Sequence, residues 1–501
     1  MSQRELTRMM WREFTRAWAG FVALLAAWML VLPLFAGPDE PANFIKSAAV
    51  VRGELVGEPI AASVSTSFWS TYVDIDPQFG AAQLVPWCFV GQPSVAACDK
   101  PLESLTPVEP SRTDMGRYPP LGFVPAGVGT FVGASDAGVR AARITAALAC
   151  AALLALAALT LRRRGGSLVP LLAVATPGVL FWSSVSSPSG LEIAAAIAAW
   201  SALWASVREQ WNDRFATIAF ASSAALLIAA RPAGLVAVAV MIAAAAIANH
   251  RALWYTARRE WYLPVTLGAA TCLSAAWYVA VYDANFGVQL NVEGRVTSLS
   301  TIATRSFNDL PRLIGEWVGN FGWLDTPSPV YVVWVFVALW AALVWRTAAS
   351  THRRQRVALG VVALAAPLWL VALNANYQDL LGSFGAQGRH LAPLLVGVPL
   401  AAALTYRIGR RDSLLVGVTI VVHAWCVLVA LRRYSLGAGG DDVLGFLREP
   451  VWSPPLGMTL TLVVVVVAHL AAWFALRSPT DGVLRSPAGG VLRSPAGRLE
   501  R

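Results

Sequence analysis

Long runs of apolar residues recur along this chain of 501 residues, and short polar breaks rich in arginine separate them. Each run approaches or exceeds ~18 residues, the length at which a helix can cross the hydrocarbon core of a bilayer. The pattern predicts an all-α polytopic membrane protein with about twelve spans. The expected spans are 17–36, 139–161, 167–186, 190–207, 215–231, 233–249, 262–282, 329–346, 357–374, 390–406, 413–431 and 456–476.

Composition agrees with the apolar pattern, since 56% of the residues are hydrophobic and 14% are charged. Soluble proteins carry about 25% charged residues, so a large soluble domain is excluded. The net charge of +10 does not predict a nucleic-acid partner, because the arginines concentrate in short breaks between spans. Such breaks face the cytoplasm in membrane proteins. We therefore expect a multi-pass protein of the plasma membrane, surrounded by lipids, with both termini in the cytoplasm.

The chain divides into three parts. Residues 1–16 form a cytoplasmic helix whose arginines recur every four residues and face anionic lipid. A cleavable signal peptide is the alternative for this end, but the apolar stretch is long for one. Residues 17–476 form the membrane module. Residues 477–501 repeat the letters GVLRSP and are expected to be a disordered cytoplasmic tail.

Four polar segments are expected on the extracytoplasmic side, at 37–138, 283–328, 375–387 and 432–455. An apolar stretch at 119–134 interrupts the first of them. If it crossed the membrane, the arginines at 162–164 would lie outside, which the positive-inside rule disfavours. We therefore interpret this stretch as a surface helix. Long loops over a helical bundle are where a membrane enzyme would hold its site.

Two adjacent carboxylates, Asp39 and Glu40, follow the first expected span and lie between Pro38 and Pro41. Carboxylates fixed at a membrane face can act as a general base or bind a divalent cation such as Mg²⁺ or Mn²⁺. The alternative is an ordinary solvated helix end.

Arginines at the same expected depth are candidates for binding a phosphate. Arg143 lies just inside the second span, where a guanidinium is costly unless it meets an anion, a carboxylate or the headgroups. Arg389 begins the tenth span between Gln387 and His390, and a guanidinium there could grip a lipid phosphate with two hydrogen bonds. His390 is more simply a polar anchor at the interface.

Other candidates gather in the same expected loops. Arg117 and Tyr118 precede the surface helix, and Trp323 and Asp325 precede the eighth span, where an aromatic anchor with a polar turn is the alternative. Glu192 begins the fourth span and has either a site role or a partner arginine, of which Arg231 is the nearest by depth.

The first loop contains two cysteines, Cys88 and Cys98. A disulfide between them is expected if that loop is extracytoplasmic. No phosphate-binding loop, dinucleotide fingerprint, zinc-protease motif or nucleophile elbow occurs. The cytoplasmic breaks are short, so we expect no nucleotide site on that side.

These motifs together resemble the GT-C class of membrane glycosyltransferases, particularly protein O-mannosyltransferases and aminoarabinose transferases. The segments PDEP at 38–41, YPPL at 118–121, GWLDTP at 322–327 and QGR at 387–389 are also similar to one bacterial family of membrane proteins described as a domain of unknown function. The resemblance covers nearly the whole chain up to the tail.

The resemblance implies a GT-C-like bundle and a polyprenyl-phosphate-linked sugar as donor. The acceptor would be a cell-envelope glycan, glycolipid or protein on the extracytoplasmic face. Asp39 would be the base, with Glu40 as partner or substitute. Arg143 and Arg389, together with Arg117, would bind the donor phosphate. The chain departs from the family pattern at Asn43, where His is frequent, and at His390, where Tyr is frequent.

Two other functions remain open. A transporter or flippase of lipid or polysaccharide predicts charged or broken helices near mid-membrane and related halves, and the sequence has neither signal. A scaffold for cell-envelope assembly would need no site. The alanine- and arginine-rich, lysine-poor usage is typical of a high-GC genome such as that of an actinobacterium, which points to wall polymers as acceptors.

Overall fold

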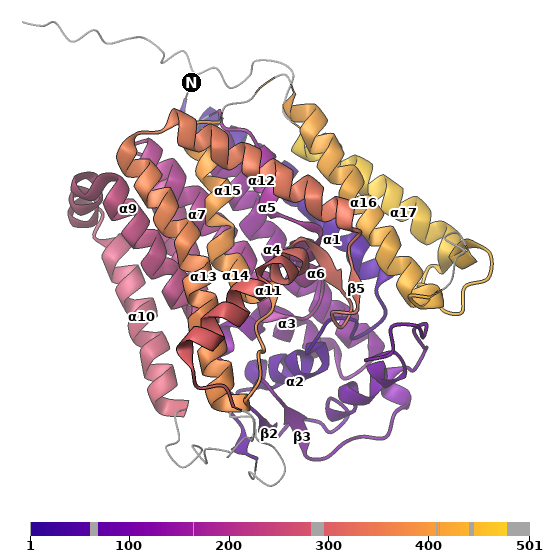
Figure 1. Ribbon diagram of the computed structural model, residues 1–501. Coiled ribbons are helices and arrows are strands. Elements are labelled where there is room, and N and C mark those ends of the chain that lie inside the picture. Colours follow the sequence, from indigo (N-terminus) through magenta and orange to yellow (C-terminus); the bar gives the residue numbers. More distant parts are fainter. Residues whose placement is uncertain are drawn as a thin grey trace, which may run out of the picture.

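The computed structural model describes residues 2–60, 69–163, 165–281, 295–406, 409, 411–439 and 445–477. Within these ranges nine helices are long and apolar enough to cross a membrane, and they form a helical bundle (Figure 1). They are α1 (Gln3–Val31), α4 (Asp136–Arg162), α7 (Pro188–Arg208), α9 (Pro232–Arg259), α10 (Tyr262–Val281), α12 (Val330–Ser350), α13 (Arg353–Leu381), α16 (Asp412–Leu436) and α17 (Gly457–Leu476). The predicted all-α polytopic fold is confirmed.

Three expected spans fall on shorter helices. The span expected at 215–231 is α8 (Arg214–Ala230), and that at 390–406 is divided into α14 (Gly388–Leu395), α15 (Gly397–Leu400) and η6 (Ala401–Leu404). The single helix expected at 167–186 is wrong, because α5 (Val169–Val174) ends before α6 (Pro177–Ser184) begins. Thr176 caps α6 by accepting a hydrogen bond from the Val179 N–H, and Pro177 cannot continue a preceding helix.

Several boundaries also differ from expectation. The basic helix at 1–16 and the first span are one continuous helix, α1, which ends at Val31 because Pro33 follows. Helix α13 continues into the segment expected as a loop at 375–387. The expected disordered tail lies outside the described residues, apart from Arg477.

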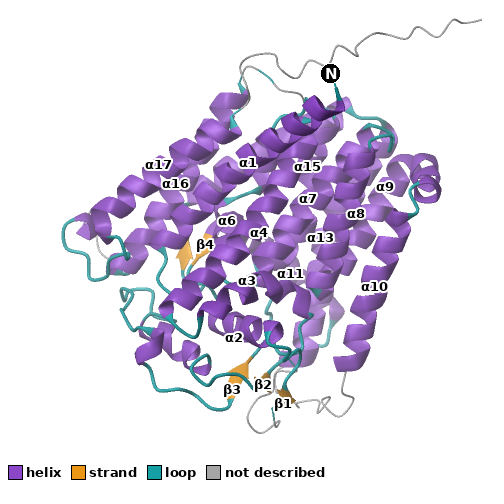
Figure 2. Cartoon of the chain, turned by 180° about the vertical axis from the view of Figure 1, so that it is seen from behind, coloured by secondary structure: helices purple, strands orange, loops and turns teal. Residues whose placement is uncertain are grey.

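The chain between α1 and α4 is called the first loop from here on, and its described residues are 32–60 and 69–135. They fold over the end of the bundle opposite the N-terminus (Figures 1 and 2). A three-stranded antiparallel sheet has the order β1-β2-β3, with Thr71 opposite Thr113. The expected surface helix at 119–134 is three short helical pieces that pack on α2 and α4. The elements of this loop are α2 (Glu40–Val51), β1 (Glu58–Pro59), β2 (Thr71–Val73), η1 (Gly80–Cys88), η2 (Leu102–Ser104), β3 (Ser111–Thr113), η3 (Pro120–Phe123), α3 (Val124–Gly129) and η4 (Thr130–Val132).

A second long connection, expected as a loop at 283–328, contains the amphipathic helix α11 (Leu299–Gly319). Its buried residues Ile302, Ser306, Leu313 and Trp317 recur at helical spacing, which explains why this polar segment is helical. A hairpin of β4 (Asn320–Phe321) and β5 (Thr326–Pro327) follows it. The remaining short element is η7 (Gly445–Leu447).

Helix α7 lies at the centre of the bundle, and all of its residues from Pro188 to Val207 are buried. Trp200 and Trp204 stack on each other with ring centroids 5.6 Å apart. Their indole N–H groups donate to the carbonyls of Pro393 and Gly397, both at 2.9 Å. The divided helix that begins at Gly388 is thereby tied to the core, which fixes the position of the residues at its start.

Candidate active site

The carboxylate of Glu40 is fully buried and accepts four hydrogen bonds. Arg143 donates from Nε to Oε1 at 2.7 Å and from Nη2 to Oε2 at 2.8 Å. The backbone N–H groups of Ser186 and Gly37 donate to the same two oxygens at 2.9 and 3.0 Å. Arg143 also donates to the carbonyl of Pro33 at 2.8 Å. Arg143 therefore has Glu40 as its anion, and its expected contact with a donor phosphate gains no support.

Asp39, the other carboxylate of the pair, faces a different partner. Its Oδ2 accepts a hydrogen bond from Nη2 of Arg389 at 2.8 Å, and 39% of the Asp39 side chain is exposed. Asp39 precedes α2 with a φ of 58°, a left-handed conformation that is uncommon for a residue with a side chain. This backbone turn directs two neighbouring carboxylates to two different arginines.

The guanidinium of Arg389 is buried, with 7% of its side chain exposed. It lies 4.5 Å from the centre of the Trp182 ring, a cation–π contact that fixes its plane. The preceding Gly388 packs so closely that a Cβ atom would lie 2.5 Å from the carbonyl oxygen of Leu313. The Gly388 N–H donates to Glu316 at 2.8 Å, so α11 holds the start of α14 in place.

A second buried ion pair joins Arg231 to Glu192, with Nη1 and Oε2 3.5 Å apart. Arg231 also donates to the hydroxyl of Ser189 at 2.8 Å. The pairing of Glu192 with Arg231, expected from their shared depth, is present in the structure. The guanidinium carbon of Arg231 also lies 5.1 Å from the centre of the Tyr118 ring, a cation–π contact.

Tyr118 is contacted by an aromatic ring as well as by Arg231. Trp69 stacks on its ring with centroids 4.1 Å apart. Burial raises the pKa of Tyr118, and the guanidinium groups of Arg231 and Arg389 oppose this shift. These contacts bring together the first loop, α6 with Trp182, α7 with Glu192, the junction of α8 and α9 with Arg231, and α14 with Arg389. This group of Asp39, Tyr118, Trp182, Glu192, Arg231 and Arg389 is called the two-arginine site below.

Gln387 and His390 border the two-arginine site. The Gln387 N–H donates to Nδ1 of His390 at 3.2 Å, so the histidine caps its own helix. The His390 ring lies 6.2 Å from that of Tyr377. This capping contact matches the polar-anchor interpretation of His390.

Three buried polar atoms around this site have no hydrogen-bond partner among the described residues. They are Nε of Arg389, Oε1 of Gln387 and the hydroxyl of Tyr278, which lies within electrostatic range of Tyr118 and Arg231. An unsatisfied buried polar group costs about 1–3 kcal/mol, so such groups are usually completed by water or a ligand.

Trp323 and Asp325 lie in a separate cluster. The Trp323 indole N–H donates to the carbonyl of Phe35 at 3.0 Å. Asp325 accepts a hydrogen bond from Nη2 of Arg433 at 2.8 Å and another from the Thr326 hydroxyl. The hairpin thus supports the segment that leads to Asp39 without bringing its carboxylate into the two-arginine site.

Cys88 and Cys98 form the disulfide that was expected if the first loop is extracytoplasmic. The loop that it closes surrounds Arg433, which donates to the carbonyls of Phe89, Gln92 and Val95. Arg433 is 2% exposed. The disulfide therefore closes a loop whose carbonyl groups bind the Arg433 guanidinium.

Arg117 is buried at 2% exposure, and its backbone carbonyl accepts a hydrogen bond from the Trp277 indole at 3.0 Å. This contact ties the first loop to α10. The structure supports a role for Arg117 in positioning the neighbouring Tyr118, whereas its expected contact with a donor phosphate stays a prediction.

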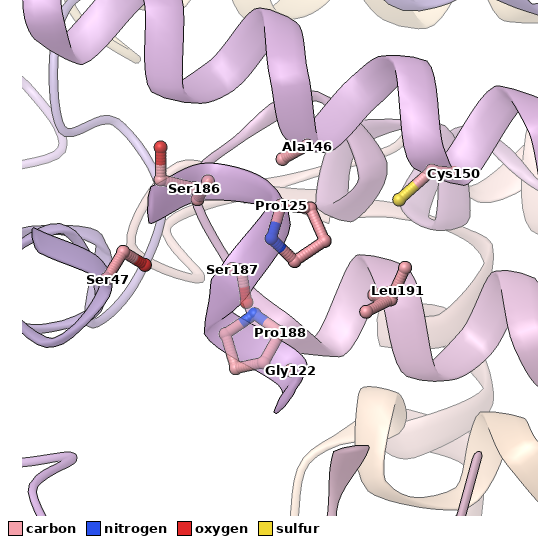
Figure 3. Close-up of a pocket in the computed structure, with 10 residues that line it drawn as sticks. Ser47, Gly122, Pro125, Ala146, Cys150, Ser186, Ser187, Pro188 and Leu191 are labelled. Carbon is pink, nitrogen blue, oxygen red and sulfur yellow. The ribbon is translucent and has the colours of Figure 1, made fainter. Parts of the chain in front are cut away.

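A small pocket with an empty volume of about 260 Å³ adjoins the Glu40 ion pair through Ser186 (Figure 3). Ser47, Pro125, Cys150 and Pro188 also line it, and no charged side chain does. The buried hydroxyl of Ser186 has no partner among the described residues. Because its walls lack an acid or a base, this pocket does not provide the acid–base chemistry.

The carboxylates do not form a site for a divalent cation. Among the described residues, no three His, Cys, Asp or Glu side chains group in a way that could hold a metal ion. Both oxygens of Glu40 are occupied by N–H donors, and Asp39 pairs with Arg389. The residues present therefore do not fit the Mg²⁺ or Mn²⁺ considered from the sequence.

Several residues of these clusters carry no signal in the sequence. Trp69, Trp182 and Glu316 come from distant segments and lack a recognisable motif. Arg433 lies in an arginine pair that resembles an ordinary polar break. Only the fold reveals that each contacts a candidate residue.

Comparison with known proteins identifies the family. Residues 22–398, more than half of the chain, match the family described as "Predicted membrane protein (DUF2142)". No curated protein matches the chain. The crystal structure of ArnT from Cupriavidus metallidurans in the apo state aligns with a TM-score of 0.41 and 14% sequence identity, over 82% of this chain and 72% of that chain. At this level of similarity no residue role or substrate is carried over. The expected resemblance to a family of unknown function is confirmed: the chain is a multi-pass membrane protein of the DUF2142 family.

Proposed function

We propose that this protein is a glycosyltransferase that moves a sugar from a polyprenyl-phosphate donor to a cell-envelope acceptor on the extracytoplasmic face. The observation that carries the proposal is the contact between Asp39 and Arg389. A partly exposed carboxylate and a buried arginine meet at the end of the first span. One can take a proton, and the other can hold a phosphate.

The arginines suit the leaving phosphate. A polyprenyl-phosphate sugar carries one negative charge on a phosphodiester, and the released polyprenyl phosphate carries about two. Arg389 is fixed by Trp182, and Arg231 is in cation–π contact with the Tyr118 ring. Fixed positive charge of this kind stabilises the extra charge that develops as the bond to the sugar breaks.

Asp39 suits the role of base. In the proposed reaction, an acceptor hydroxyl gives its proton to the Asp39 carboxylate while its oxygen bonds to the anomeric carbon. The bond from that carbon to the phosphate oxygen breaks, and the electron pair stays on the phosphate. Asp39 is the more exposed partner in its ion pair, so an acceptor can reach it.

The charge distribution supports the extracytoplasmic side. Arg162 and Arg163 end α4, and Arg258 and Arg259 end α9. Helix α9 starts directly after Arg231, and Arg143 near the start of α4 pairs with Glu40, so these arginines lie at the far ends of both helices. Because positive residues concentrate at cytoplasmic ends, this distribution supports the proposal that the site faces outward.

The test uses membranes from cells that express the full chain, supplied with a polyprenyl phosphate carrying a radiolabelled pentose or hexose. We expect Asp39→Asn to reduce label transfer by about 10²- to 10⁴-fold, the usual contribution of a general base. Asp114→Asn is the matched control, because Asp114 is an exposed first-loop carboxylate that also pairs with an arginine. Full turnover by Asp39→Asn would overturn the base assignment. Movement of the intact donor between leaflets, without transfer, would favour a flippase.

A further inference from the structure

We propose that Arg389 holds Asp39 as a latch while the site is empty, and that the donor phosphate opens this latch before the acceptor can react. This inference rests on the proposed function and concerns the order of events at the same site. Its basis is the single hydrogen bond between the Asp39 carboxylate and Nη2 of Arg389.

The hydrogen-bonding edge of Arg389 is only half used. Nη2 donates to Asp39, whereas the neighbouring Nε is buried and has no partner among the described residues. A phosphate binds a guanidinium most strongly through two parallel hydrogen bonds, and Nε with Nη2 form one such edge. A phosphate that takes both atoms therefore removes Asp39 from Nη2.

The two partners differ in freedom to move. Arg389 is 7% exposed, stacks on Trp182, and follows a glycine held by Leu313 and Glu316. Asp39 is 39% exposed and is held to Arg389 by one side-chain hydrogen bond. The arginine therefore stays in place, and the carboxylate swings away.

Glu40 keeps this movement local. Its four hydrogen bonds fix the backbone directly after Asp39. The Asp39 carbonyl also accepts a hydrogen bond from the Asn43 N–H at 2.9 Å, which fixes the first turn of α2. Release of Asp39 thus needs rotation of one side chain and no rearrangement of the helix.

The latch has a chemical consequence. Without donor, Oδ2 of Asp39 is occupied by the hydrogen bond from Arg389 and is not available to an acceptor hydroxyl. Once the phosphate occupies Arg389, the carboxylate loses its cation and is free to accept the acceptor proton. An acceptor hydroxyl is therefore activated only when a donor is present, so donor binds before acceptor.

Binding of a radiolabelled polyprenyl phosphate without sugar tests the latch, using the full chain in lipid nanodiscs. We expect Asp39→Asn to bind about three- to tenfold more tightly than the wild type, because the competing carboxylate loses its charge. Arg389→Gln should bind at least about tenfold more weakly. Asp114→Asn should bind like the wild type, since its arginine pair lies elsewhere in the first loop.

The outcomes separate the two proposals. If Arg389→Gln weakens binding and Asp39→Asn does not strengthen it, the latch is wrong while the donor site stands. If Arg389→Gln leaves binding unchanged, the donor site itself is wrong. Asp39→Ser provides a second neutral variant, and the melting temperature of each protein shows whether it is folded. Tighter binding in both neutral variants supports the latch.

Discussion

Asp325 and Arg433 form an ion pair, with Oδ2 and Nη2 2.8 Å apart and the two side chains 12% and 2% exposed. The Arg433 guanidinium lies against the loop that the Cys88–Cys98 disulfide closes. The guanidinium also donates to the loop carbonyls, so one arginine holds both the hairpin and the first loop. Tyr434, the next residue, donates to the carbonyl of Ala36 at 3.2 Å. This pair therefore supports the segment that carries Asp39.

Removing Arg433 is expected to destabilise the protein. Arg433→Met leaves Asp325 buried without its cation, and loss of one member of a buried pair costs about 3–5 kcal/mol. We expect a lower melting temperature of the detergent-solubilised protein. Asp325→Asn in the same background should recover part of the loss, because it removes the uncompensated charge. Arg411→Met, at the exposed other end of α16, is the control and should melt like the wild type. Equal melting temperatures for Arg433→Met and the control would show that the Arg433 contacts do not stabilise the fold.

Glu40 is expected to stabilise the fold and to take no part in the reaction. Glu40→Gln leaves the guanidinium of Arg143 with an uncompensated buried charge, at a cost of about 3–5 kcal/mol. The measurement is the folded yield and melting temperature, with exposed Glu58→Gln on β1 as the control. The double variant Glu40→Gln, Arg143→Met should recover part of the loss. A Glu40→Gln protein that is fully stable but inactive would instead make Glu40 catalytic.

Arg231 is expected to contribute to donor binding more than Glu192 does. Arg231→Gln removes a positive charge beside Tyr118 and leaves Glu192 to repel a phosphate, so polyprenyl phosphate should bind at least about tenfold more weakly. Glu192→Gln keeps the positive charge and should bind at least as well as the wild type. Arg214→Gln, at the exposed other end of α8, is the control. Weaker binding by Glu192→Gln than by Arg231→Gln would argue against this assignment.

Lys46 is expected to make stability depend on pH. Burial lowers the pKa of Lys46 to about 7, against a smaller opposing effect of Glu54. Its ammonium group donates to the carbonyls of Leu55 and Gly116. The unfolded lysine has a pKa of about 10.4. Between these two values the unfolded chain binds more protons, so stability rises with pH across this window and falls as pH drops towards 7.

The measurement for Lys46 is the melting temperature between pH 7 and pH 10. Lys46→Met removes the titrating group and should flatten this rise, although the protein has other groups that titrate. Exposed Lys100→Met is the control and should keep the slope of the wild type. An unchanged slope in Lys46→Met would show that the folded protein keeps Lys46 charged.

The sequence predicted the apolar spans and the pairing of Glu192 with Arg231, because both depend on depth in the membrane. It could not separate the roles of Asp39 and Glu40. Glu40 pairs with Arg143 and Asp39 pairs with Arg389, because the left-handed backbone at Asp39 directs the two carboxylates to different sides. No local pattern encodes this choice, since it depends on contacts between residues up to 350 positions apart.

Helix α11 shows a different limit. Its polar residues made the segment look like a loop, and the apolar positions that bury it are widely spaced. The break between α5 and α6 was missed for the opposite reason, since a continuous apolar run hid the effect of Pro177. Composition identifies the membrane environment, but hydrogen bonding at single residues decides where each helix ends.

The hydrogen bonds of Glu40 have a consequence for the order in which the chain assembles during synthesis. One donor, Ser186, lies 146 residues further along the chain. Until the turn between α6 and α7 has emerged and inserted, the Glu40 carboxylate lacks one of its four hydrogen-bond donors. The first loop is therefore made early but completed late, so the position of Asp39 is set only after several later spans are in the membrane.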